Sequence, residues 1–336
     1  MRRRLFISAV LLSISAYVFS QGLDITVKPR LEGAYNSAYN QEGKEFGLGM
    51  SSLYTFLDGS ITDNLSYYAS LHFLNSDPKG LYNYDNPCMY GTWVDMAYLS
   101  YNRDFWGIDL GKVFMNLGGM SNEYDDVDVY SGLVPFNWNE FTTYQYGLTL
   151  RLTPWENHSF EGQFTTSPYN DPEVSSKLLY GYGICWRGEM GQFSTSWAVN
   201  GFNSWSDDDD PVKETNINIG LGNKYEFNDR WNIEFDAYLH AFNCDFANLE
   251  YSDFNLTGAF NPGESLTLKA LAGLRGTKAW VFGGLCEYYP VENLRLHAAL
   301  SYYDTDKLPE GYLAYHSNSF EASIGVTYTL DFHIGR

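Results

Sequence analysis

The clearest pattern in the sequence is a two-residue alternation of apolar and polar positions, sharpest near the C-terminus. Between 320 and 332 the even positions are apolar or aromatic, among them Phe320, Ile324 and Phe332, while the odd positions carry polar side chains or glycine. Since successive side chains of a β-strand point to opposite faces, this segment predicts a strand with one apolar and one polar face. The same division recurs at 65–73, 144–152, 216–227, 231–241 and 293–303.

A soluble β-sandwich would alternate in the same way, so the connections between strands decide the fold class. Seven short turns are predicted at 58–63, 102–105, 153–158, 188–191, 227–230, 260–265 and 290–293. Between them lie eight connections, mostly longer and polar, near 36–43, 76–92, 116–142, 168–176, 203–214, 243–250, 274–277 and 304–318. Short periplasmic turns that alternate with longer external loops are expected of a bacterial outer-membrane barrel. The sequence therefore predicts an all-β fold, a transmembrane antiparallel β-barrel of about sixteen strands with both ends on the periplasmic side.

The composition fits a barrel better than a helical membrane protein. After the N-terminus, no apolar stretch approaches the ~20 residues that a membrane-spanning helix needs. Aromatic residues make up 18% of the chain, although the mean hydropathy is only −0.32. A barrel needs this combination, because its two aromatic girdles face lipid while its lumen is polar.

The N-terminus has the three parts of a secretory signal peptide. Arg2, Arg3 and Arg4 form a basic start, an apolar run covers 5–18, and Ser20 precedes Gln21. The apolar run is too short for a transmembrane helix, which needs ~20 residues, and it matches the apolar core of a signal peptide. We therefore expect cleavage near Ser20/Gln21, which removes residues 1–20 and leaves 21–336 as one barrel domain among the lipids of a Gram-negative outer membrane.

The charge of the mature chain excludes one class of partner. Without the three N-terminal arginines it carries 18 basic and 41 acidic residues, a balance of −23. Because contacts to phosphate dominate nucleic-acid binding, nucleic acid is excluded as a partner and polyanionic ligands are disfavoured.

Signals for metal, cofactor or catalytic sites are weak. The four cysteines have no CxxC spacing, so we expect neither a metal site nor a redox dithiol; Cys88 and Cys244 either form a bridge or stay free. The acidic run at 207–210 lacks the spacing of a Ca²⁺ loop and is interpreted as a solvated external loop. No GxSxG, HExxH or P-loop pattern is present, so we expect no catalytic residue, no cofactor and no enzyme activity.

The longest predicted connection, 116–142, is the candidate pore constriction. Its glycine and aromatic content favours a loop that folds inward and packs on the lumen wall; a loop that covers the barrel mouth or contacts a neighbouring subunit is the alternative. It contains no Lys or Arg, and its acidic residues include Glu123, Asp125, Asp126 and Asp128. These carboxylates are predicted to face basic residues of the wall and to create a transverse field across the channel.

The water-facing positions of the predicted strands supply the lumen wall. This wall is predicted to include Arg30, Glu32, Asp109, Asp236 and Lys269, with Arg30 and Lys269 near mid-depth. Four further basic residues lie close to short turns and are predicted nearer the periplasmic rim, where local ion pairing is the alternative role: Arg151, Arg187, Lys224 and Arg295.

One stretch of the chain resembles a known family. The segment LGKVFMNLGGM at 110–120, followed by EYDDVDVY at 123–130, resembles the corresponding region of Bacteroidetes-type outer-membrane porins related to the phosphate-selective porin O and P family. The resemblance implies a sixteen-stranded homotrimer with an in-folded third loop. Phosphate selectivity is not carried over, because it needs a ladder of inward Arg and Lys, whereas the predicted lumen positions hold more acidic than basic residues.

The expected strand number bears on function. Barrels of about sixteen strands enclose an aqueous channel, whereas about eight strands leave an interior filled by side chains. We therefore expect a passive pore for small hydrophilic solutes or ions, cation-preferring or weakly selective. The alternative from another class is a structural barrel within a secretion or surface-assembly machine.

Overall fold

The computed structural model describes residues 22–37, 45–73, 94–130, 133, 135, 143–170, 177–205, 213–247, 252–276, 279–304 and 319–335. The first half of the described chain contributes β1 (Leu23–Asn36), β2 (Glu45–Gly47), β3 (Ser52–Thr62), β4 (Leu65–Phe73), β5 (Val94–Arg103), β6 (Trp106–Phe114), β7 (Tyr144–Trp155), β8 (His158–Thr166) and β9 (Tyr180–Met190). The second half contributes β10 (Phe193–Trp205), β11 (Lys213–Asn228), β12 (Trp231–Ala241), β13 (Asp253–Gly263), β14 (Leu266–Arg275), β15 (Ala279–Val291), β16 (Leu294–Asp304), β17 (Ser319–Tyr328) and β18 (Leu330–Ile334).

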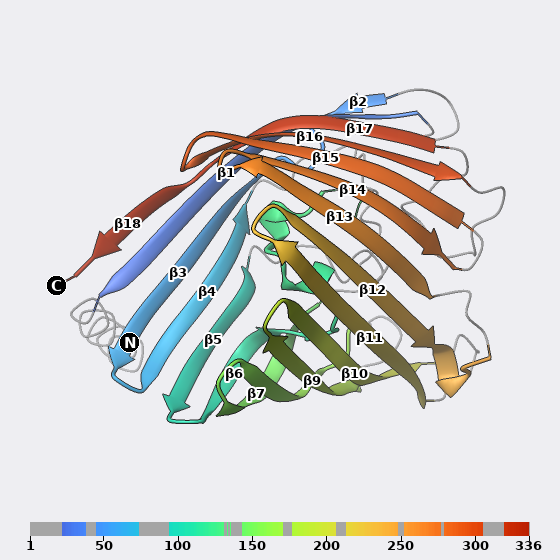
Figure 1. The fold of residues 1–336 in the computed structure, drawn as a ribbon. Helices are drawn as coiled ribbons and strands as arrows, with labels where there is room; N and C mark the ends of the chain where they lie inside the picture. Colours follow the sequence, from blue (N-terminus) through green and yellow to red (C-terminus); the bar gives the residue numbers. More distant parts are fainter. Residues whose placement is uncertain are drawn as a thin grey trace, which may run out of the picture.

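The strands close into a ring (Figure 1). Each strand pairs antiparallel with its neighbours, and β1 closes the ring by pairing with β3 on one side and with β17 and β18 on the other. Because β2 and β3 follow one another along β1, as β17 and β18 do, the described stretches form sixteen wall strands. The prediction of an all-β, transmembrane antiparallel barrel is confirmed.

The two faces of the wall follow the alternation in the sequence. Along β16, Leu296 and Leu300 are exposed, whereas His297 and Ser301 between them are buried inside the barrel. In a membrane barrel the exposed apolar side chains face lipid and the polar ones face the lumen. The same register repeats around the ring, so the barrel places Arg30, Asp236 and the other polar residues discussed below on its inner surface.

The seven short turns are shorter and lie later than predicted. In the structure each is a two-residue hairpin, as at 63–64 and 104–105, so the predicted turn segments mostly belong to strands. The segment 58–63 is an example: Asp58 pairs with Tyr68 and Gly59 pairs with Tyr67, inside the β3–β4 ladder. The error has a physical reason: the polar residues that suggest a turn are also favourable on the water-facing side of a barrel strand.

Helical structure in the described residues is limited to three short 3-10 turns, η3 (Met120–Glu123), η4 (Asp126–Asp128) and η5 (Phe242–Cys244). None of the described helices is long and apolar enough to cross a bilayer. Cys185, Cys244 and Cys286 are free thiols. Cys88 and the acidic run at 207–210 lie outside the described residues, as does the predicted signal peptide.

Candidate pore constriction

The segment that follows β6 turns inside the ring of strands instead of leaving it (Figure 1). The backbone N–H of Met115 first donates to the carbonyl of Thr143, at 2.7 Å, across the base of the loop. The N–H of Gly119 then donates to the carbonyl of Ser196 on β10, at 2.9 Å. From there η3 contacts β11 and β12, and the chain continues to β1, β15 and β16. We call residues 115–130 the inner segment.

The inner segment packs against the wall at two places, which we call its first and second seats. Glycines form the first seat. A Cβ atom on Gly220 of β11 would overlap the carbonyl oxygen of Leu117, and one on Gly222 would overlap the backbone of Met120. The inner segment itself turns here through Gly119, whose positive φ of 88° favours glycine. Small residues on both sides therefore let two backbones approach closely.

Asp236 and Tyr238 of β12 secure this seat by hydrogen bonds. The Asp236 carboxylate accepts the backbone N–H groups of Met120 and Ser121, at 2.5 and 3.0 Å. The Tyr238 hydroxyl lies 2.7 Å from the Ser121 hydroxyl and accepts the side-chain amide of Asn122 at 3.0 Å. Asp236 was predicted as a wall residue, and in the structure it satisfies two backbone donors that a loop inside a barrel would otherwise leave unpaired.

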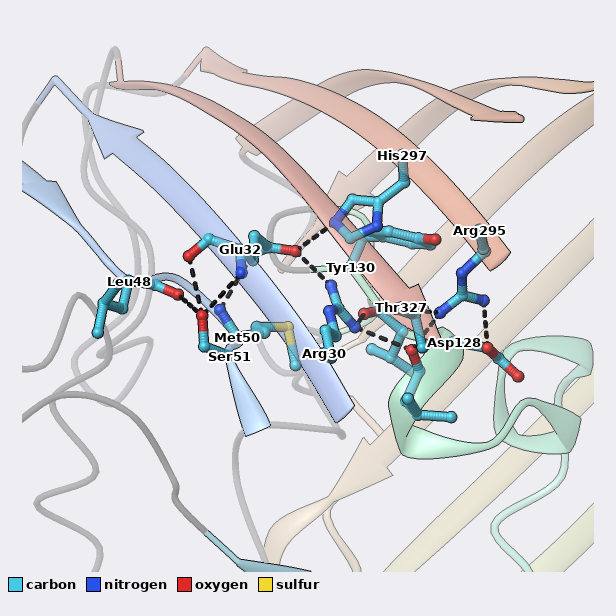
Figure 2. A network of polar contacts seen from close by, with 12 residues as sticks. Arg30, Glu32, Leu48, Met50, Ser51, Asp128, Tyr130, Arg295, His297 and Thr327 are labelled. Carbon is cyan, nitrogen blue, oxygen red and sulfur yellow. Dashed lines mark hydrogen bonds and ion pairs between the residues drawn. The ribbon is translucent and has the colours of Figure 1, made fainter. Parts of the chain in front are cut away.

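Two arginines form the second seat (Figure 2). Arg30 of β1 donates to the carbonyl oxygens of Val127 and Val129, at 3.0 and 2.7 Å. Arg295 of β16 donates to the same Val127 carbonyl at 2.7 Å and forms an ion pair with Asp128. The carbonyl groups of this turn are therefore held by positive charge from two strands.

Tyr130 fills the space beside the two arginines. Its ring lies 4.9 Å from the Arg30 guanidinium and 4.9 Å from the His297 ring, between centres. Its hydroxyl donates to Glu287 at 2.6 Å. Burial raises the pKa of the Tyr130 hydroxyl, and the Glu287 carboxylate raises it further, so the hydroxyl stays protonated and keeps this hydrogen bond.

Glu32, another predicted wall residue, binds the Arg30 guanidinium and fixes its position (Figure 2). Its carboxylate accepts a hydrogen bond from Arg30 at 2.5 Å and lies 2.8 Å from the His297 ring nitrogen. The other carboxylate oxygen accepts the N–H of Met50 at 3.1 Å, and Ser51 hydrogen-bonds to the Glu32 backbone. The break between β2 and β3 is thus built around Glu32, and the second seat extends into the wall.

The sequence predicted that acidic residues of the inner segment face basic residues of the wall across the channel. In the structure three of these acidic residues instead contact basic residues directly. Glu123 pairs with Arg187 of β9 at 2.8 Å and accepts a hydrogen bond from Ser196 at 2.7 Å. Asp125 lies 3.5 Å from Lys28, and its side chain is 58% exposed. Asp128 pairs with Arg295, as described above. The Asp126 backbone belongs to η4, and its side chain is outside the described set.

Arg295 was predicted to lie nearer the periplasmic rim than Arg30. In the structure both residues pair with Thr327 in the sheet, from opposite sides, and both reach the Val127 carbonyl. Arg187 also reaches the inner segment, whereas Lys224 forms the local pair that was the alternative, 2.7 Å from Glu226.

The remaining wall residues divide into two groups. Lys269 of β14 places its ammonium group 4.7 Å from the ring centre of Tyr124, so it contacts the inner segment. Asp109 instead pairs with Arg151 at 3.0 Å, on the β6–β7 part of the wall. The roles of Tyr130 and Tyr238 were missed from the sequence. For Tyr238 the available signal was a large aromatic residue at a water-facing strand position, whereas Tyr130 lies in a connection without such a pattern.

Comparisons with known proteins agree with this architecture. No family model and no curated protein matches the sequence. Among solved structures, the outer-membrane channel DcaP of Acinetobacter baumannii is 12% identical, with a TM-score of 0.65 over 92% of this chain and 97% of that chain. A mutant of Rh. blastica porin is 15% identical, with a TM-score of 0.63 over 92% and 100%. OmpT of Vibrio cholerae, an outer-membrane protein, is 13% identical, with a TM-score of 0.60 over 93% and 98%.

These neighbours show what fold the chain has: the closed, antiparallel, sixteen-stranded barrel of outer-membrane porins. The narrower kinship with the phosphate-selective porin O and P family stays a prediction.

Proposed function

We propose that the mature chain is an outer-membrane porin through which small hydrophilic solutes and ions diffuse passively. The observation that carries the proposal is the inner segment, which is built into the barrel at two seats by Gly220, Asp236, Arg30 and Arg295. A segment attached to the wall at two places would narrow the lumen. The strands on the other side of the ring, β3 to β7, would line the remaining passage.

The proposed selectivity is a weak preference for cations. The mature balance of −23 favours cations near the pore mouths. At the constriction, however, Glu123 and Asp128 are each in contact with an arginine, which offsets their charge. Of Glu123, Asp125 and Asp128, Asp125 is the carboxylate most open to solvent, and its contact with Lys28 is longer, at 3.5 Å. We therefore expect Asp125 to contribute more to ion preference than Glu123 or Asp128.

The proposed location is the outer membrane of a Gram-negative cell, after removal of residues 1–20. The exposed apolar residues of the wall, such as Leu110, Ile184 and Ile324, support burial in lipid. The homotrimer implied by the family resemblance is part of the same proposal. Chemical cross-linking of the purified protein in mild detergent, followed by heat denaturation, would measure the oligomeric state.

The decisive test is conductance of the purified mature protein in planar lipid bilayers. A porin should give stepwise, ohmic current increments, and the protein should let small sugars swell liposomes. Heat-modifiable migration in gels would show that the inserted barrel is folded. A folded barrel that inserts but gives no conductance steps would contradict the proposal and favour a structural role in a secretion or surface-assembly machine.

A further inference from the structure

The lumen face opposite the inner segment carries aromatic rings. On β1 the inward residue Lys28 pairs with Tyr54 of β3, so Tyr54, Phe56 and Asp58 share the lumen face of β3. The register then places Tyr68 of β4 opposite Asp58. An aromatic lumen surface is unusual, because the interior of a pore-forming barrel is generally polar.

Aromatic rings lie on three neighbouring strands, β3, β4 and β5. Tyr68 pairs directly with Tyr98 in the sheet, and their ring centres lie 5.4 Å apart at an interplanar angle of 31°. Phe56 occupies the next level of the ladder, opposite Ser70. Phe56, Tyr68 and Tyr98 are each partly exposed. We call these three residues the aromatic row.

The aromatic row begins at the constriction. The Lys28 ammonium group lies 5.3 Å from the ring centre of Phe56 and 3.5 Å from the Asp125 carboxylate of the inner segment. A solute that passes the tip of the inner segment therefore meets the Phe56 end of the row. The row is part of the passage and not a separate patch.

A fixed pair of charged groups flanks the other end of the row. Asp109 of β6 pairs in the sheet with Ser100, two residues after Tyr98 on β5, and its carboxylate lies 3.0 Å from Arg151. Arg151 also donates to Ser100 at 2.9 Å and to Asn102 at 2.7 Å. This group is neutral overall, rich in donors and acceptors, and held in place by the wall.

We propose that the aromatic row binds the sugar rings of linear oligosaccharides during passage, an inference that rests on the proposed pore function. A pyranose ring presents C–H groups on its flat faces and hydroxyl groups around its rim. The electron-rich faces of Tyr68 and Tyr98 suit the former. The Asp109–Arg151 pair and the exposed carboxylate of Asp58 suit the latter.

Other solutes fit this surface less well. A fully apolar solute would cover Asp109 and Arg151 without replacing their contacts with water, which is costly. A small inorganic ion gains nothing from the stacked ring faces beyond what the charges supply. A neutral, flat, hydroxylated solute satisfies both kinds of group at once.

The test is current blockage in planar bilayers with maltohexaose as the probe and potassium chloride as the electrolyte. We expect maltohexaose to interrupt the ion current in a saturable manner. A polyethylene glycol of equal hydrodynamic radius should lower the current only in proportion to its concentration. In the double variant Tyr68→Leu/Tyr98→Leu, the concentration for half-blockage should rise about tenfold, because two flat faces are lost while apolar bulk is kept.

Tyr67→Leu is the matched control, because Tyr67 is adjacent in β4 but points to the opposite face. This variant should block like the parent protein. Equal single-channel conductance in potassium chloride shows that each variant forms an intact barrel. If the parent conducts ions but maltohexaose gives no saturable block, or the double variant blocks unchanged, the sugar proposal is overturned while the pore stands. Preferential block by phenyltrimethylammonium instead of maltohexaose would also overturn it.

Discussion

Arg30 and Arg295 converge on one atom, since each guanidinium donates a hydrogen bond to the carbonyl oxygen of Val127, at 3.0 and 2.7 Å. The two arginines come from opposite ends of the chain and are brought together by strand β17, where both pair with Thr327. The second seat of the inner segment therefore exists only after the barrel has closed. Closure of the ring and placement of the constriction are one structural event.

Replacement of both arginines by lysine should loosen the inner segment without changing its charge. A lysine ammonium lacks the planar fork through which Arg30 binds the two carbonyls with Nη1 and Glu32 with Nη2. Each lost charged hydrogen bond is worth about 1.5–3 kcal/mol. We expect Arg30→Lys/Arg295→Lys to raise the open-channel current noise and to lower the thermal unfolding midpoint, while the reversal potential stays the same.

Arg151→Lys is the control for this experiment, because Arg151 pairs with Asp109 on the wall, outside the two seats. Equal current noise in Arg151→Lys and in the double variant would argue against a role of Arg30 and Arg295 in holding the inner segment. The effects of Arg30→Lys and Arg295→Lys should also be non-additive, since both residues act on the Val127 carbonyl.

A single methyl group at Gly220 should displace the first seat. A Cβ there would overlap the Leu117 carbonyl, and backbone on both sides leaves little freedom to yield. We expect Gly220→Ala to change single-channel conductance and to reduce thermal stability by about 1–3 kcal/mol, as overpacking usually does. Gly258→Ala on β13 is the matched control, since a Cβ there meets nothing within 4 Å. Identical conductance in the two variants would mean that the seat at Gly220 does not set the pore size.

The fold was predictable because a barrel wall between lipid and water imposes the same two-residue period on every strand. That period predicts the face of each residue, and in the structure Arg30, Glu32 and Asp236 are buried polar residues. It does not give strand ends. Asp58 and Gly59 look like a turn, yet they lie within a strand.

Depth and pairing were not predictable from the pattern. Arg295 is the second residue of its strand, whereas Arg30 lies well inside β1, yet both pair with Thr327. The cause is the stagger of tilted strands that closure of a barrel requires, which no single segment records. Glu123 and Arg187 meet across 64 positions of sequence, a contact that depends on the path of the inner segment through space.

The last strand offers a test of assembly. Phe332 of β18 is 51% exposed on the lipid side and pairs with Ile25 of β1, at the seam where the two ends of the chain meet. We expect Phe332→Ala to reduce the amount of barrel in the outer membrane, measured by fractionation and heat-modifiable migration. Thr329→Ala, between β17 and β18, serves as the comparison. Normal levels of the Phe332→Ala barrel would contradict a role for this residue in insertion.

Ion preference should separate Asp125 from Asp128. Two unit charges ~4 Å apart interact by ~1 kcal/mol in bulk water and by ~4 kcal/mol at an effective dielectric constant of ~20, so one exposed carboxylate beside a narrow passage can bias ion entry severalfold. Asp125 is 58% exposed and weakly paired, whereas Asp128 is 34% exposed and held by Arg295. We expect Asp125→Asn to shift the reversal potential toward anions without added noise. Asp128→Asn should add noise as well, because it removes a contact of the second seat. Both shifts should shrink as salt rises toward 1 M, where the Debye length is ~3 Å. If the reversal potential of Asp125→Asn at low salt equals that of the parent protein, the part of the inner segment that carries Asp125 lies away from the ion path.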